Sequence, residues 1–137
     1  MSYKIGVVGY SGAKFDKDEA FEMLLEALQM FRHTEDVNLE LVSGLTDLGI
    51  PALAYRIAEE WGWKTTGIAC SKAKEYDCFQ VDNIIIVGDN WGNESEEFLH
   101  YIDVLVRVGG GKQSLAEVTR AKELGITVFE YELPEIK

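Results

Sequence analysis

Residues 103–117 read DVLVRVGGGKQSLAE, and this stretch decides the expected fold. It opens with an apolar run of the length of a buried strand, which leads into three glycines. Residues 114–124 then carry apolar side chains at helical spacing. The expected inner face of this helix is Leu115, Val118, Ala121 and Leu124. A strand that passes through glycines into a helix is the repeating unit of a parallel α/β protein.

The same alternation of strand and helix continues along the chain. Strands are expected at residues 4–9, 39–43, 65–70, 83–88, 103–108 and 126–131. Helices are expected at residues 16–32, 51–61, 93–102 and 114–124, while residues 71–82 leave a short helix or a loop open. Right-handed crossovers would place helices on both faces of the sheet. The sequence therefore predicts an α/β fold, a single three-layer Rossmann-like domain over residues 1–137, with a mainly parallel sheet of about six strands.

Three expected helix starts have the spacing of a capping box, in which two side chains satisfy the free backbone N–H groups of the first turn. These pairs are Asp16 with Glu19, Asn93 with Glu96, and Ser114 with Glu117. In the helix after Asp16, the expected apolar face is Phe21, Leu24, Leu25, Leu28 and Phe31. Each pair has a structural role that needs no ligand.

The composition is that of an acidic globular protein. The 137 residues include 13 lysines and arginines against 24 aspartates and glutamates, which gives a net charge of −11. Phosphate backbones and anionic membranes repel such a chain, so neither nucleic acid nor a membrane is an expected partner. No apolar run approaches the ~20 residues that a membrane helix needs, and the first residues lack the pattern of a signal peptide.

The two cysteines, Cys70 and Cys78, are not expected to bind a metal. They lack CxxC spacing and nearby histidines. We interpret them as free thiols in a reducing compartment, so a cytoplasmic location is expected. The sequence predicts neither a metal site nor a bound cofactor.

The glycines gather after the expected strands, where parallel strands present their carboxyl ends at one edge of the sheet. Ligands of α/β proteins bind at that edge. Glycine admits a ligand close to the backbone, and the following helix offers free N–H groups to an anion. The alternative is that the loops need glycine merely to turn. The candidate ligand-binding residues are Gly9, Ser11, Gly12, Gly44, Gly49, Gly109, Gly110, Gly111, Lys112, Ser114 and Trp91.

Two well-known phosphate motifs do not fit. Residues 111–114 look like the end of a Walker A loop, but Gln113 stands where Ser or Thr would hold magnesium. Val106 stands where the first glycine of that loop belongs. The glycines after the first strand have the spacing GxxGxxG instead of the dinucleotide fingerprint GxGxxG. Neither an ATPase nor a typical dehydrogenase is supported.

Four segments resemble the LOG family, the cytokinin-activating phosphoribohydrolases. Residues 108–117 (VGGGKQSLAE) resemble the PGGxGTxxE signature of that family, and residues 103–108 are similar to the strand before it. Residues 7–12 (VVGYSG) and 43–52 (SGLTDLGIPA) are similar to its first two glycine loops. The wider group is the SLOG superfamily of nucleotide-binding Rossmann-like domains. The resemblance implies a homodimer or a larger homo-oligomer.

The resemblance also implies roles for single residues. In LOG enzymes the signature loop holds the phosphate of a nucleoside monophosphate, and Gly110, Gly111 and Ser114 match its positions. Glu117 matches the catalytic glutamate. The arginine with which that glutamate acts on the N-glycosidic bond has no counterpart, because residues 93–100 read NESEEFLH.

The acidic residues 94–97 have two interpretations. They suit the first turn of a helix, where negative charge is stabilising, or they face the crevice and repel phosphate. Lys14, Lys112 and Arg107 are the cations that would compensate for such repulsion.

Three hypotheses follow. The first is binding of a nucleotide or nucleotide-derived small molecule at the carboxyl edge of the sheet. The second is a nucleoside-monophosphate phosphoribohydrolase or N-glycosidase, in which Glu117 assists departure of the base. The third is a non-catalytic interaction module whose crevice is filled by its own side chains. Trp91, in a polar loop at that edge, either stacks on a ligand base or covers the core.

Overall fold

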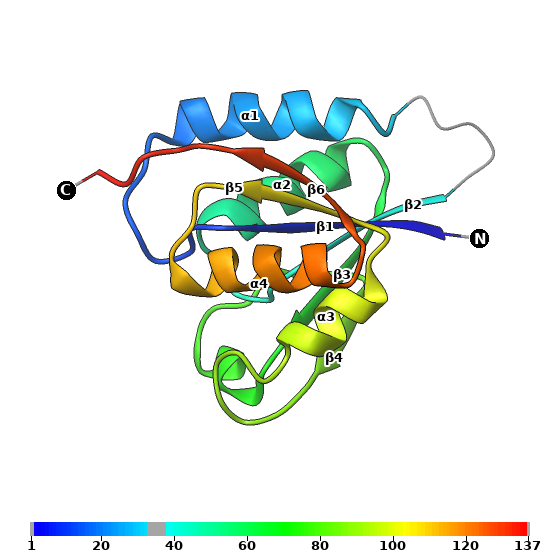
Figure 1. The fold of residues 1–137 in the computed structure, drawn as a ribbon, viewed down its shortest axis with the longest axis vertical. Helices are drawn as coiled ribbons and strands as arrows, with labels where there is room; N and C mark the ends of the chain where they lie inside the picture. Colours follow the sequence, from blue (N-terminus) through cyan, green and yellow to red (C-terminus); the bar gives the residue numbers. More distant parts are fainter. Residues whose placement is uncertain (1, 33–37, 137) are drawn as a thin grey trace.

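The computed structural model describes residues 2–32 and 38–136, and its strands form a six-stranded sheet in which all neighbours are parallel (Figure 1). The strands are β1 (Ser2–Gly9), β2 (Asn38–Ser43), β3 (Lys64–Ala69), β4 (Asn83–Ile86), β5 (Val104–Val108) and β6 (Thr127–Tyr131). Their order across the sheet is β4-β3-β2-β1-β5-β6. The predicted α/β class and number of strands are confirmed.

Helices connect the strands and cover both faces of the sheet. They are α1 (Lys17–Gln29), α2 (Gly49–Glu60), the short 3₁₀-helix η1 (Ser71–Glu75), α3 (Ser95–Tyr101) and α4 (Lys112–Glu123). Helices α1 and α2 pack on one face, and α3 and α4 pack on the other (Figure 1). This arrangement confirms the three layers. The helix η1 accounts for the first part of residues 71–82, which the sequence left open.

The core lies in two layers, one on each face of the sheet. Strand β1 shows why: Ile5 and Val7 are buried toward α1 and α2, whereas Val8 is buried toward α3 and α4. Successive side chains of a strand point to opposite faces, so a strand covered on both sides is apolar throughout. The continuous apolar runs of the sequence follow from this burial.

The inner faces of α1 and α4 share two residues each with the predicted faces and differ from them at the other positions. Phe21 is 38% exposed and Leu115 is 49% exposed, so the prediction was wrong for both. The buried stripes are Ala20, Leu24, Ala27 and Leu28 on α1, and Ser114, Glu117, Val118 and Ala121 on α4. One residue turns a helix by about 100°. The prediction followed apolar side chains and missed that two polar ones on α4 face inward.

One of the three predicted caps forms. The carboxylate of Asp16 accepts hydrogen bonds from the backbone N–H groups of Asp18 and Glu19, at 3.0 and 3.1 Å. Helix α4 instead begins at Lys112, so Ser114 already lies inside its first turn. Asn93 likewise does not cap α3, since its side chain accepts from the backbone of residues 89–90.

The chain order reverses at β1, which lies between β2 and β5. The chain runs from β1 outward to β4 on one side and then returns to β5 and β6 on the other. Such a switch point opens a crevice at the carboxyl ends of the strands. Within residues 2–32 and 38–136, no helix is long and apolar enough to cross a membrane.

Candidate ligand-binding site

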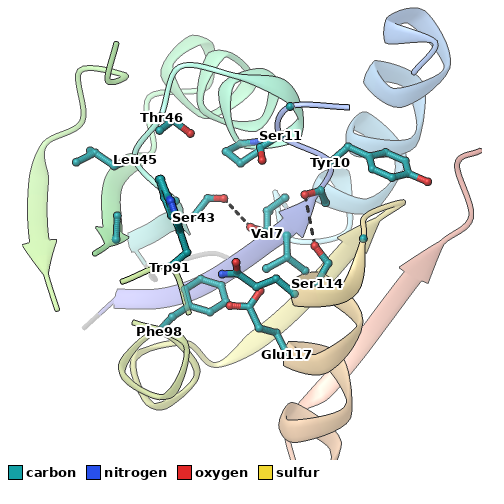
Figure 2. Close-up of a pocket in the computed structure, with 18 of the residues that line it drawn as sticks. Val7, Tyr10, Ser11, Ser43, Leu45, Thr46, Trp91, Phe98, Ser114 and Glu117 are labelled. Carbon is teal, nitrogen blue, oxygen red and sulfur yellow. Dashed lines mark hydrogen bonds between the residues drawn. The ribbon is translucent and has the colours of Figure 1, made fainter. Parts of the chain in front are cut away.

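A cavity of about 390 Å³ lies at this switch point, between the loops that follow β1 and β2 and the start of α4 (Figure 2). Nine of the predicted site residues line it: Gly9, Ser11, Gly12, Gly44, Gly111, Lys112, Ser114, Trp91 and Glu117. Three predicted residues do not: Gly49, Gly109 and Gly110. The structure thus brings together the loops that the glycine pattern selected.

The first loop follows β1 and forms one wall of the cavity. A Cβ atom at Gly9 would collide with the carbonyl of Val108 and with Ile50, so glycine is required here for close packing. The Tyr10 ring points away from the cavity (Figure 2) and stacks on Phe15, with ring centroids 5.9 Å apart. The backbone of this loop therefore faces the cavity, while its aromatic side chain belongs to the core.

The second loop follows β2 and is held by buried hydroxyl groups. Ser43 donates a hydrogen bond from Oγ to the carbonyl of Val7 at 2.6 Å (Figure 2). The hydroxyl of Tyr55, on α2, donates to the carbonyl oxygens of Gly44 and Thr66 at 2.6 and 3.1 Å. These bonds tie the loop to the sheet and to α2.

Gly49 joins the first two loops instead of facing the cavity. Its φ is +58°, and a Cβ atom there would meet the backbone of Tyr10 and Ser11. The next residue, Ile50, donates from its backbone N–H to the carbonyl of Tyr10 at 2.8 Å. Gly49 therefore supports the site by fixing how closely the two loops approach.

The third loop carries the predicted phosphate-loop glycines and leads into α4. Gly109 and Gly110 have φ values of +62° and +108°, which side chains rarely adopt. A Cβ atom at Gly110 would lie 2.6 Å from both Cβ and Oγ of Ser114. These two glycines turn the chain so that Gly111, the residue before α4, reaches the cavity.

The first turn of α4 presents free backbone N–H groups to the cavity. In a helix the first N–H groups have no partner within the helix. Gly111 supplies no side-chain cap, and among the described residues no other group accepts a hydrogen bond from the N–H of Lys112, Gln113 or Ser114. All three residues line the cavity. This helix start can bind an anion, because its N–H groups and dipole both favour negative charge.

Glu117 faces the cavity from the same side of α4 as Ser114 (Figure 2). It is 8% exposed, and its Oε2 accepts a hydrogen bond from Ser95 Oγ at 2.8 Å. Burial raises the pKa of Glu117 to about 6, and the Glu94 carboxylate adds to this rise against the opposing hydrogen bonds of Ser95 and Gln113. Its bond to Ser95 replaces the predicted bond to the helix start, so the capping-box interpretation was wrong.

Glu94 is a site residue that the sequence analysis did not single out. The sequence left residues 94–97 open between a helix turn and the crevice, and Glu94 is 5% exposed and lines the cavity. Its Oε1 accepts from the backbone N–H of Gly92 at 2.9 Å and from Gln113 Nε2 at 3.3 Å. Its Oε2 is buried and has no hydrogen-bond partner within residues 2–32 and 38–136. The available signal was spacing, since Glu94 lies four residues before the buried Phe98.

Arg107 does not serve the cavity. Its guanidinium donates to Glu130, at 2.9 Å, to Glu132 and to the carbonyl of Gly109, at 2.8 Å. Burial alone would lower the pKa of Arg107, but the hydrogen bonds that it donates to these two carboxylates raise it. Arg107 therefore anchors the third loop and is not available to a phosphate.

Among the described residues that line the cavity, Lys112 is the one with a positively charged side chain. The acidic side chains that line it are those of Glu94, Glu117 and Glu135. Lys14, the other cation that the sequence suggested, does not line the cavity. The described residues also hold no group of three or more histidine, cysteine, aspartate or glutamate side chains that could bind a metal ion. The site therefore combines one anion-binding end with one acidic end.

Trp91 lies on the rim of the cavity and does not fill it. Its side chain is 48% exposed, and its ring centroid lies 5.9 Å from that of Tyr76. The side chains of Phe98 and Leu45 form part of the apolar wall of the cavity. A flat ring entering the cavity would meet aromatic and aliphatic surface on this side.

The fold and the glycine loops define a Rossmann-like α/β protein of the SLOG type, as the sequence predicted. No family model and no curated protein match the chain. Its fold is similar to that of the molybdenum cofactor carrier protein of Chlamydomonas reinhardtii, with 25% identity and a TM-score of 0.73. That alignment covers 95% of this chain and 76% of the carrier protein.

Two further solved structures have a similar fold. The molybdenum cofactor binding protein of the phototrophic bacterium Rippkaea orientalis is 22% identical, with a TM-score of 0.77 over 95% of this chain and 76% of that one. The structural-genomics target TM1055 is 25% identical, with a TM-score of 0.72 over 92% of this chain and 72% of that one. These likenesses extend over 92–95% of this chain.

Proposed function

We propose that this protein binds a phosphate-bearing, nucleotide-like small molecule in the cavity at the switch point. The observation that best supports this proposal is made at the start of α4. Three backbone N–H groups there lack hydrogen-bond partners among the described residues, and their residues line the cavity. The phosphate would bind these groups, with Lys112 supplying the positive charge. The rest of the ligand would extend toward Trp91 and the acidic end of the cavity.

The structural neighbours support a binder of this kind. Two of them are described as carrying or binding the molybdenum cofactor. That cofactor, like a nucleotide, joins a nitrogen heterocycle to a phosphate group. A cavity of about 390 Å³ lies in the range of small-molecule sites. A nucleotide and a pterin phosphate share this chemistry. We therefore propose the class of phosphate-bearing nitrogen heterocycles as ligands.

The open cavity favours ligand binding over a module whose crevice is closed. The third hypothesis requires the protein's own side chains, Trp91 for example, to fill the crevice. Trp91 instead lies at the rim with about half of its surface exposed. The oligomeric state expected from the resemblance stays a prediction, which light scattering tests.

Glycosidic hydrolysis is the second candidate, and the observation that favours it is the environment of Glu117. A carboxyl group with a pKa of about 6 holds a proton close to neutral pH and can protonate a leaving base. None of the described residues that line the cavity is an arginine, so the cation that the resemblance assigns to this reaction is missing. Release of free base from AMP or GMP, lost in Glu117→Gln, tests this candidate.

The anion site itself is tested by the substitution Gly111→Asp. Gly111 has an ordinary φ of −97° and open space around its Cβ position, so aspartate fits there. An aspartate before a helix accepts hydrogen bonds from the first-turn N–H groups. The variant would therefore occupy the proposed phosphate site with its own carboxylate. We expect it to gain about 0.3 kcal/mol of stability and to lose ligand binding.

The measurement is isothermal calorimetry with AMP and GMP, compared with adenosine and guanosine. We expect the monophosphates to bind more tightly than the nucleosides and to lose this advantage in Gly111→Asp. Gly111→Ala, which adds a methyl group without a carboxylate, is the matched control and keeps the N–H groups free. The proposal is overturned if neither monophosphate binds at millimolar concentration, or if Gly111→Asp binds both as well as the unchanged protein does.

A further inference from the structure

We propose that the acidic end of the cavity, Glu94 with Glu117, selects ligands whose ring presents adjacent N–H donors, such as the 2-amino-4-oxopyrimidine edge shared by guanine and pterins. This inference rests on the proposed function, because it assigns a ring class to the same site. It concerns only the part of the cavity that Glu94 and Glu117 line.

The unpartnered oxygen of Glu94 is the observation that points to a ligand. The side chain is held in place through Oε1, which accepts from the Gly92 backbone and from Gln113 Nε2. The other oxygen, Oε2, is buried without any donor among the residues that the structure describes. A buried carboxylate oxygen without a hydrogen bond costs free energy, so a hydrogen-bond donor on a ligand would be a favourable partner for it.

Glu117 places a second acceptor beside the first. Its Oε2 is bonded to Ser95, and Gln113 contacts both carboxylates, so the two side chains meet around one amide group. The charge of Glu94 opposes ionisation of Glu117, which shows that the two carboxyl groups are close. Two adjacent acceptors match two adjacent donors on one ring edge.

The acidic end is joined to the anion site through α4. Gln113 contributes a free backbone N–H to the anion site and contacts Glu94 through its side chain. Ser114 and Glu117 lie on the same buried stripe, about one helical turn apart. The free N–H groups and the two carboxyl groups therefore line one cavity, and one ligand that fills it would meet both.

This chemistry distinguishes the common bases. Guanine presents the N1–H and the 2-amino group side by side, and both are donors. Hypoxanthine keeps N1–H but lacks the 2-amino group. Adenine places the N1 lone pair beside its amino group, and that lone pair would face carboxylate oxygens. We therefore expect GMP to bind more tightly than IMP, and IMP more tightly than AMP.

The test compares GMP, IMP and AMP by calorimetry at one salt concentration. Hydrogen bonds to charged groups lead us to expect a GMP-to-AMP affinity ratio of about tenfold or more. Glu94→Gln should reduce that ratio to about threefold or less. The ratio is the readout, because removing a negative charge near the phosphate raises the affinity for all three nucleotides together. Glu97→Gln, a change at an exposed position of the helix that follows Glu94, should leave the ratio intact.

The outcomes separate this inference from the function on which it rests. If all three nucleotides bind equally and Gly111→Asp abolishes binding, the anion site stands and the base selection is overturned. If none binds, both are overturned. If Glu94→Gln fails to fold, the order of affinities in the unchanged protein still decides, since a preference for AMP or no preference contradicts the inference.

Discussion

The hydroxyl of Tyr55 donates a hydrogen bond to the carbonyl oxygen of Gly44 at a distance of 2.6 Å. Tyr55 is fully buried on α2, and Gly44 lies in the loop that lines the cavity. Burial raises the pKa of this phenol far above its usual range, so the hydroxyl stays a donor at every accessible pH. The bond connects the core of the protein directly to the wall of the candidate site.

We expect Tyr55→Phe to destabilise the protein by about 1–3 kcal/mol, because it leaves the buried carbonyls of Gly44 and Thr66 without this donor. Urea denaturation followed by circular dichroism measures the loss. Tyr76→Phe is the control, since Tyr76 is 52% exposed. Equal stabilities of the two variants would contradict the role assigned to the hydroxyl.

Glu117 should make the stability of the protein depend on pH. Burial raises its pKa from 4.5 to about 6, so the folded state favours the protonated form. This contribution is fully present below pH 4.5 and is lost as the pH rises through about 6. The difference of about 1.5 between the pKa values of the unfolded and folded states corresponds to about 2 kcal/mol of unfolding free energy at pH 7. Glu117→Gln should therefore be more stable than the unchanged protein at pH 7, by up to that amount.

The advantage of Glu117→Gln should shrink as the pH falls and vanish about one unit below pH 4.5, where the carboxyl group is protonated in both states. Denaturation curves between about pH 3.5 and 7.5 measure it. Glu97→Gln, at an exposed position, should show no such change with pH. An advantage of Glu117→Gln that is the same at all pH values would refute the explanation by burial of the charge.

The third loop offers a paired test of backbone shape and ligand access. Gly110→Ala introduces a side chain at a φ of +108° and within 2.6 Å of Ser114, so we expect a loss of about 1–3 kcal/mol of stability. Gly111→Ala has open space around its Cβ position and should keep the stability within about 0.5 kcal/mol. Thermal unfolding separates the two variants, and similar losses in both would contradict this account of the loop.

Trp91 should report ligand binding by fluorescence. Its ring lies at the rim of the cavity, whereas Trp61 and Trp63 pack against each other at the end of α2 and before β3. A ring bound in the cavity would change the surroundings of Trp91 alone. Titration with GMP should alter the emission of the unchanged protein, and Trp91→Phe should remove the change. A response that persists in that variant would place the ligand elsewhere.

The sequence predicted the positions of the loops better than the directions of their side chains. The six strands and the clustering of glycines at one edge followed from apolar runs and turn residues, which are local properties. The roles of Gly49 and Gly109 depend on contacts with Tyr10, which is far away in the sequence. Residue spacing along the chain cannot predict such contacts. These glycines fix the approach of one loop to another, although the pattern assigned them to the ligand.

The acidic residues show the other limit of the sequence. The spacing of Ser114 and Glu117 fits a capping box, yet Glu117 bonds to Ser95 on a different helix. Glu94 is one of several glutamates in a short stretch, and its burial depends on how α3 meets α4. The sequence could not tell which of these glutamates is buried, because glutamate is mostly exposed and a buried unpartnered carboxylate is rare in a stable fold.

The position of β1 between β2 and β5 also determines the order in which the parts of the site are synthesised. The first loop of the site, residues 9–13, is made about a hundred residues before the free N–H groups of residues 112–114. The strand that precedes these groups, β5, pairs directly with β1. A nascent chain therefore has one wall of the candidate site without the other until β5 and the first turn of α4 have been synthesised.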